Sequence, residues 1–131
     1  TTINTLEFVT ISSSGGGVDF GDLSQAREYP GGTDDGSRGV HAGGASPTIV
    51  DTIDYISIGT AGNSADFGNL SASVTSVSAV SNGSRGLFST FGTATASTDA
   101  IDYITIGVLS NVTDFGEISQ ARSGGTACSG A

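Results

Sequence analysis

The sequence repeats itself, and this repeat constrains the fold more than any other feature. The segment 6–11 returns at 53–58 and again at 101–106, so the spacing is 47 and then 48 residues. A second segment, 18–23, returns with the same spacing at 65–70 and 113–118. A repeat of this length is one supersecondary unit that buries its surface against its neighbours. The chain is therefore expected to be built from equivalent stacked units.

Two shorter blocks follow the same period and define the units. The Gly-Ser-Arg-Gly block at 36–39 recurs at 83–86, and the Ser-Gln-Ala-Arg block at 24–27 recurs at 119–122. We therefore divide a single repeat domain, 1–131, into a partial repeat, two complete repeats and a second partial repeat. Their bounds are 1–23, 24–70, 71–118 and 119–131.

Each repeat has the pattern of β-structure. Ile53, Tyr55 and Ser57 alternate with their neighbours, and β-branched and aromatic residues dominate the segment. Clusters of Gly, Asn and Ser separate such segments, as turns do. No window has an apolar period of 3.6 residues. We expect an all-β chain with four short strands per repeat, at about 53–58, 65–70, 74–80 and 85–91.

Four short strands in a period of this length are typical of a β-propeller blade, which is a four-stranded antiparallel sheet. The strands nearest the propeller axis favour small residues, and the segments 31–32, 77–79 and 124–127 with the following Cys128 meet that need. The chain holds about 2.75 blades, whereas closed rings have about 4–8. Three arrangements stay open: a piece of a longer chain, a ring closed by several copies, and a fibre. We favour the first two.

The aromatic residues recur in the same register. Phe20, Phe67 and Phe115 are expected to fill equivalent buried positions between neighbouring sheets. Each belongs to an Asp-Phe-Gly triplet. We interpret the triplet structurally, with Phe packed between blades, Gly in a turn and Asp accepting hydrogen bonds of the turn.

The order of motifs resembles a known family. Arg27, the strand from Arg38 to Gly43-Gly44, Tyr55 and Asp66-Phe67 follow one another as in kelch-type repeats. The segment 51–70 is similar to kelch-like repeats in tailed phages of marine cyanobacteria. The resemblance implies a non-enzymatic structural protein of the virion, such as a tail fibre, an appendage or a capsid-associated protein. It also implies self-association or contact with other virion proteins, and contact with the host surface.

Charge and hydropathy exclude two classes of partner. The chain has 13 acidic residues against four basic ones and a formal charge of −9, so it lacks the basic patch that binds phosphates. We expect no binding of nucleic acid. No run approaches the roughly 20 apolar residues of a membrane span, and we expect no insertion into a membrane.

No constellation of residues indicates catalysis, a cofactor or a metal. His41 has no second His or Cys near it in sequence for a zinc site, and no base–nucleophile pair is evident. The turn with Asp34 and Asp35 could hold calcium, but an ordinary acidic turn is the favoured interpretation. Tyr29 is the aromatic residue of a variable loop, 28–36. A glycan-binding, lectin-like module is the alternative function, but it would need aromatic residues repeated on one loop face, so a single Tyr29 weakens it.

The scarce arginines complete the set of candidate binding residues. Arg38 and Arg85 begin equivalent predicted strands, and acidic residues recur in register at Asp19, Asp66 and Asp114. We expect a repeated contact between arginine and carboxylate that joins neighbouring blades. Recognition of a glycan or an anion by these arginines is the alternative. The candidate binding residues are Tyr29, Asp34, Asp35, Arg38 and Arg85.

Overall fold

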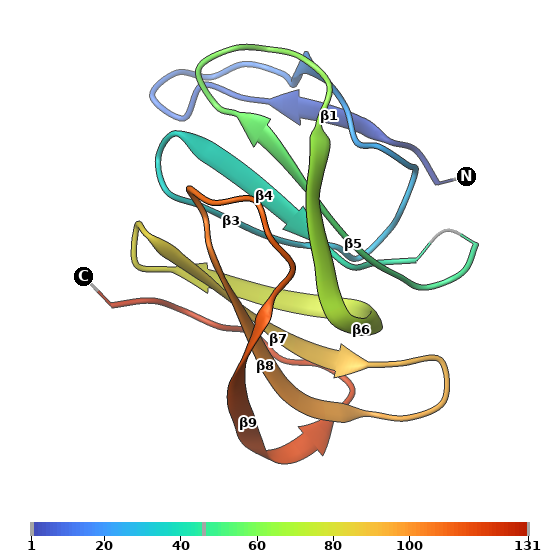
Figure 1. The fold of residues 1–131 in the computed structure, drawn as a ribbon. Coiled ribbons are helices and arrows are strands. Elements are labelled where there is room, and N and C mark those ends of the chain that lie inside the picture. Colours follow the sequence, from blue (N-terminus) through green and yellow to red (C-terminus); the bar gives the residue numbers. More distant parts are fainter. Residues whose placement is uncertain (1, 46, 131) are drawn as a thin grey trace.

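In the part of the chain that the structure describes, the regular secondary structure is antiparallel β-structure. The computed structural model describes residues 2–45 and 47–130, and these contain no helix. Figure 1 shows the strands in chain order. They are β1 (Thr5–Phe8), β2 (Val18–Asp22), β3 (Gly31–Asp34), β4 (Arg38–Ala42), β5 (Val50–Ser57), β6 (Ala65–Ser81), β7 (Arg85–Gly92), β8 (Thr98–Thr105) and β9 (Thr113–Arg122). The all-β prediction is confirmed. Nothing in the described ranges is a helix that could cross a membrane.

The strands pair in the order of the sequence. β1 and β2 form a two-stranded sheet, and β3 to β9 form a seven-stranded sheet without crossovers. β6 is 17 residues long. Its first part pairs with β5 and its second part with β7. We call β1 and β2 the N-terminal pair, β3 to the first part of β6 the first unit, and the rest of β6 to β9 the second unit. The three parts follow one another in Figure 1 from blue to red.

The same β-bulge occurs in all three parts. Opposite Leu6 and Glu7 the register runs from Gly21 to Asp19 and leaves Phe20 unpaired. Phe67 and Phe115 are left unpaired in the same way in the β5–β6 and β8–β9 ladders. A bulge bends its strand and redirects a side chain. The Asp-Phe-Gly triplet is thus a bulge within a strand rather than a turn.

The glycine after each bulge lets the next part approach closely. Gly21, Gly68 and Gly116 all have φ near +145° (144°, 151° and 143°), a region that other residues rarely adopt. A Cβ on Gly68 would lie 2.3 Å from the carbonyl oxygen of Ser110, in the second unit. The N-terminal pair meets the first unit similarly, with Gly21 equally close to the Gly62 carbonyl.

The core lies between the first and second units. Its members are apolar side chains from β4, β5 and the first part of β6 on one side and from the second part of β6, β7, β8 and the turn after β8 on the other. They are Val40, Ala42, Ile53, Phe67, Leu70, Val74, Val77, Phe88, Ile104 and Ile106. Burial of apolar area contributes roughly 25 cal/mol per Å². Stacking one unit on the next therefore supplies much of the stability of this small chain.

Two expectations about the C-terminal part are wrong. Residues 119–122 extend β9, and the segment 123–130 is not a strand. Cys128 is exposed rather than packed near an axis. Among the described residues the segment 123–130 forms no ladder with a strand, although it lies beside β6, where Ser78 Oγ donates a hydrogen bond of 2.6 Å to the Gly125 carbonyl. Strand 65–70 and strand 74–80, predicted separately, form one continuous β6.

Candidate binding sites at the junctions between units

An arginine lies over an aromatic ring in both complete units. The Arg38 guanidinium is 4.5 Å from the centre of the Tyr55 ring, and Arg85 is 4.7 Å from that of Tyr103. Each tyrosine in turn meets the bulged phenylalanine edge to face, at 6.1 Å between ring centres. Such cation–π contacts contribute about 0.5–2 kcal/mol. The bulge therefore builds an aromatic platform for arginine.

The expected contact between these arginines and carboxylates is wrong. In the described ranges the single salt bridge joins Arg27 and Asp54. Arg38 instead donates a hydrogen bond of 2.7 Å to the carbonyl oxygen of Ile106 in the second unit. It thus does join neighbouring units, but through a ring and a carbonyl group. The acidic residues of the triplets play no part in it because the bulge places only Phe on this platform.

Asp54 and Asp102 are buried carboxylates that the sequence analysis did not single out. Asp54 accepts hydrogen bonds from the backbone N–H and the hydroxyl of Ser24, at 3.1 and 2.7 Å. Asp102 accepts the same pair from Ser71, at 3.1 and 2.6 Å. Each serine lies four residues after the bulged phenylalanine of the preceding part, Ser24 beyond the end of β2 and Ser71 within β6. The contact therefore recurs at both junctions. Its signal in the sequence was the Ile-Asp-Tyr block, which contains both carboxylates, together with the serine that begins the Ser-Gln-Ala-Arg block at Ser24 and recurs at Ser71.

The first junction adds a buried ion pair. Arg27 Nη2 lies 2.6 Å from Asp54 Oδ2, and both side chains are fully buried. Arg27 also donates a hydrogen bond to the Thr52 carbonyl. Burial lowers the pKa of Arg27, while the charge of Asp54 acts in the opposite direction. Val74 takes the place of Arg27 at the second junction and is buried in the core. The two junctions thus share the serine–carboxylate contact and differ in the cation.

The acidic turn uses its carboxylates to shape the backbone. Asp34 accepts a hydrogen bond from the Gly36 N–H, and Asp35 accepts two, from the N–H groups of Ser37 and Arg38. These backbone bonds lower the pKa of the Asp35 carboxyl. In the second unit Ser81 and Asn82 make the same bonds to Gly83, Ser84 and Arg85. The equivalent turn in the second unit therefore forms without any carboxylate. This supports the interpretation of Asp34 and Asp35 as an ordinary acidic turn rather than a calcium site.

Tyr29 does not join the other candidate residues. It is 66% exposed and has a φ of 61°. It precedes β3 at the end where Gly31 pairs with Ala42, whereas Asp34 ends β3 opposite Gly39. The structure thus brings Asp34, Asp35 and Arg38 together in one turn, places Arg85 in the equivalent turn, and separates Tyr29 from them.

The three bulged phenylalanines are equivalent in geometry but not in burial. Phe67 is 3% exposed, Phe20 is half-buried and Phe115 is 52% exposed. The expectation of three equally buried rings is wrong for Phe115, because no further unit covers the outer face of the second unit among the described residues. The pairing of the rings is nevertheless constant, with Phe8 and Phe20 also 6.1 Å apart.

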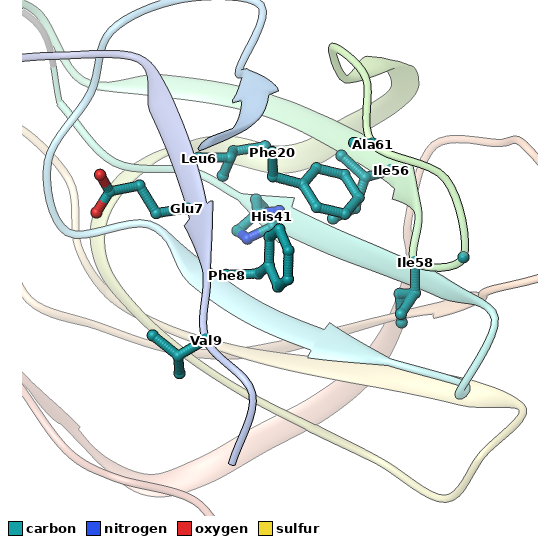
Figure 2. Close-up of a pocket in the computed structure, with 10 residues that line it drawn as sticks. Leu6, Glu7, Phe8, Val9, Phe20, His41, Ile56, Ile58 and Ala61 are labelled. Carbon is teal, nitrogen blue, oxygen red and sulfur yellow. The ribbon is translucent and has the colours of Figure 1, made fainter. Parts of the chain in front are cut away.

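An apolar cavity of about 500 Å³ lies between the N-terminal pair and the first unit. Figure 2 shows Phe8, Phe20, His41 and Ile58 around it, while Glu7 and Val9 point away. Burial lowers the pKa of His41, and the nearby positive charge of Arg27 adds to this effect while Asp54 opposes it. Within residues 2–45 and 47–130, no three His, Cys, Asp or Glu side chains gather as metal ligands.

Comparison with known proteins assigns no family. No protein-family model matches the chain, and no curated protein matches it at a significant level. The contacts that the repeats make with each other are therefore the observations from which a function can be inferred.

Proposed function

We propose that this chain is a non-enzymatic structural module of a phage particle, built from kelch-like propeller blades that assemble by stacking unit on unit. The role in a virion, as a tail fibre, appendage or capsid-associated protein that contacts the host surface, follows from the resemblance of the repeats. The contacts between the repeats support the assembly part of the proposal.

One observation carries the assembly proposal. The serine–carboxylate contact occurs at both junctions, and both of its halves are also presented on the outer faces of the described chain. Glu7 holds the position of Asp54 and Asp102 in the repeat, and its side chain is exposed. Ser119 and Arg122 hold the positions of Ser24 and Arg27 and are exposed as well. These residues would continue the stack by binding Glu7 of one copy to Ser119 and Arg122 of the next.

The glycan-binding alternative gains no support from the geometry. A sugar site on a loop face needs aromatic and polar side chains together, whereas Tyr29 and the acidic turn lie at opposite ends of β3.

A charge-exchange experiment tests the assembly. Sedimentation velocity should show association of the unchanged chain that increases with concentration. Glu7→Arg and Arg122→Glu should each abolish it, and the two together should restore it. Glu28→Arg is the matched control, because Glu28 is exposed and belongs to neither half of the contact. A chain that remains monomeric throughout, or a double variant that fails to restore association, would contradict the proposal.

A further inference from the structure

The N-terminal pair has an aromatic platform without an arginine. Its Phe8 and Phe20 rings meet edge to face at 6.1 Å, as Tyr55 and Phe67 do. Arg38 lies over the Tyr55 and Phe67 rings, at 4.5 and 6.0 Å from their centres. No such cation is found over Phe8 or Phe20 among the described residues. The same platform is therefore occupied in the first unit and open in the N-terminal pair.

The acceptor for the arginine is in place as well. Arg38 reaches across its junction to the carbonyl group of Ile106. Ile58 holds the position of Ile106 one repeat earlier, 48 residues before it. Ile58 also lines the cavity beside Phe8 and Phe20, as Figure 2 shows. The ring platform and the equivalent of the carbonyl acceptor thus border the same cavity.

The cavity occupies the space that β4 fills at the next junction. There Val40 and Ala42, which are fully buried, pack in the cluster that contains Phe88 and Ile104. His41 and Ile56 hold the positions of those two residues one repeat earlier and line the open cavity. A strand like β4 would therefore fill the cavity with an arginine, an aliphatic residue and a small residue at alternate positions.

The backbone of β1 is ready to pair with such a strand. β5 pairs with β4 on one edge and with β6 on the other, whereas β1, its counterpart, pairs with β2 alone in the described sheets. An unpaired edge is a template for another strand. Several apolar side chains of β1, of the residues that flank it and of β2 are also exposed, as is typical of interaction surfaces. They are Ile3, Phe8, Val9, Ile11 and Val18.

We propose that the β1 edge and its cavity form a binding site for an extended strand of a partner chain with the pattern Arg-x-Val/Leu-x-Ala/Ser. This pattern is that of β4 and β7, which begin Arg-Gly-Val-His-Ala and Arg-Gly-Leu-Phe-Ser. The strand pairs antiparallel to β1, with its arginine over Phe8 and Phe20 and its aliphatic residue opposite Phe8. The β4–β5 register, in which Val40 faces Tyr55, sets this alignment.

A synthetic peptide with the sequence of residues 35–43 tests the site. Titration calorimetry should detect one peptide per chain, and amide hydrogen exchange should slow in β1. A peptide with Arg38→Ala, or a chain with Phe8→Ala, should bind about tenfold more weakly. Phe115→Ala is the matched control and should not change binding, because Phe115 is similarly exposed at the opposite end of the chain. Circular dichroism checks that each variant is folded.

Three results would overturn the site. They are an absence of peptide binding, binding that does not depend on the peptide arginine, and protection of amides elsewhere than in β1. If the chain forms a dimer that buries β1 and the peptide does not displace the second copy, then a second copy, rather than a different partner, pairs with the β1 edge. The inference rests on the repeat contacts and not on the virion role. Association through Glu7 and Arg122 is measured separately, so either proposal can fail alone.

Discussion

The junction between the two complete units and the outer face of the second unit are built from the same residues in different surroundings. Phe67 and Phe115 sit in identical bulges and each meets a tyrosine at 6.1 Å. Phe67 is 3% exposed and Phe115 is 52% exposed. The difference shows that a repeat unit makes its own local geometry but not its own core. Burial is supplied by the neighbouring unit, as expected of stacked repeats.

The largest difference in stability is expected when the Phe67 ring and the Phe115 ring are removed in separate variants. Phe67→Ala should destabilise the chain by about 3–5 kcal/mol, because it leaves a cavity in the core. Phe115→Ala should cost about 1 kcal/mol, since it loses mainly an exposed ring pair. Urea denaturation of both variants measures the difference, and equal losses would show that the outer face contributes as much as the junction.

The buried carboxylates sharpen the comparison between the two junctions. Asp54→Ala should cost about 3–5 kcal/mol because it leaves the buried Arg27 without its counter-charge. Asp102→Ala should cost about 1–3 kcal/mol, since in the described part of the chain Asp102 accepts hydrogen bonds from Ser71 alone and faces no buried cation. Thermal unfolding of the two variants tests the order. Restoration of stability by Arg27→Leu in the Asp54→Ala background would confirm the cause, and its absence would argue against it.

Gly68 and Gly116 follow equivalent bulges, but the second unit covers the backbone at Gly68 and the backbone at Gly116 is uncovered. A Cβ at Gly68 would strike the Ser110 carbonyl, whereas nothing lies within 4 Å of one at Gly116. Gly116→Ala therefore costs only the unfavourable φ, about 1 kcal/mol, and Gly68→Ala should cost about 2–3 kcal/mol. Equilibrium unfolding measures both. If the two substitutions destabilise the chain equally, the second unit must shift readily to make room for a Cβ at position 68.

The smallest expected effect is a pH dependence from His41. Its pKa is lowered by burial, so the folded chain binds fewer protons than the unfolded one below the ordinary value of 6.5. Stability should thus fall as pH decreases through 6.5 toward the lower folded pKa. His41→Phe, which copies Phe88, should remove this component. Melting temperatures at about pH 7.5 and about pH 5.5 test it, and an unchanged slope in the variant would contradict it.

The sequence predicted the strands well because they depend on local patterns. The alternation at Ile53, Tyr55 and Ser57 lies within β5, and the predicted strand 85–91 lies within β7. Arg38 and Arg85 begin their strands as expected. The segment 123–130 was mistaken for a strand because small residues fit a crowded inner strand, yet a strand also needs a partner to pair with.

The site residues were predicted less well because they depend on contacts across junctions. Arg38 was expected to contact a carboxylate of a neighbouring unit, but its partners are Tyr55 and the Ile106 carbonyl. Asp54 was passed over as one alternating position of a strand. Only the meeting of Ser24 with Asp54, 30 residues away, shows that a recurring acid and a recurring serine belong to one contact.

By itself the sequence determined the unit: its period, its strands, and the recurrence of aromatic residues, arginine and acid. These follow from alternation and turn residues, which act over a few positions. The tertiary structure alone decided which copy of each residue is buried, which arginine lies over an aromatic ring, and which strand has an unpaired edge. Equivalent residues differ in these respects because their burial and pairing depend on which unit packs against theirs. The local sequence around a residue does not specify that neighbouring unit.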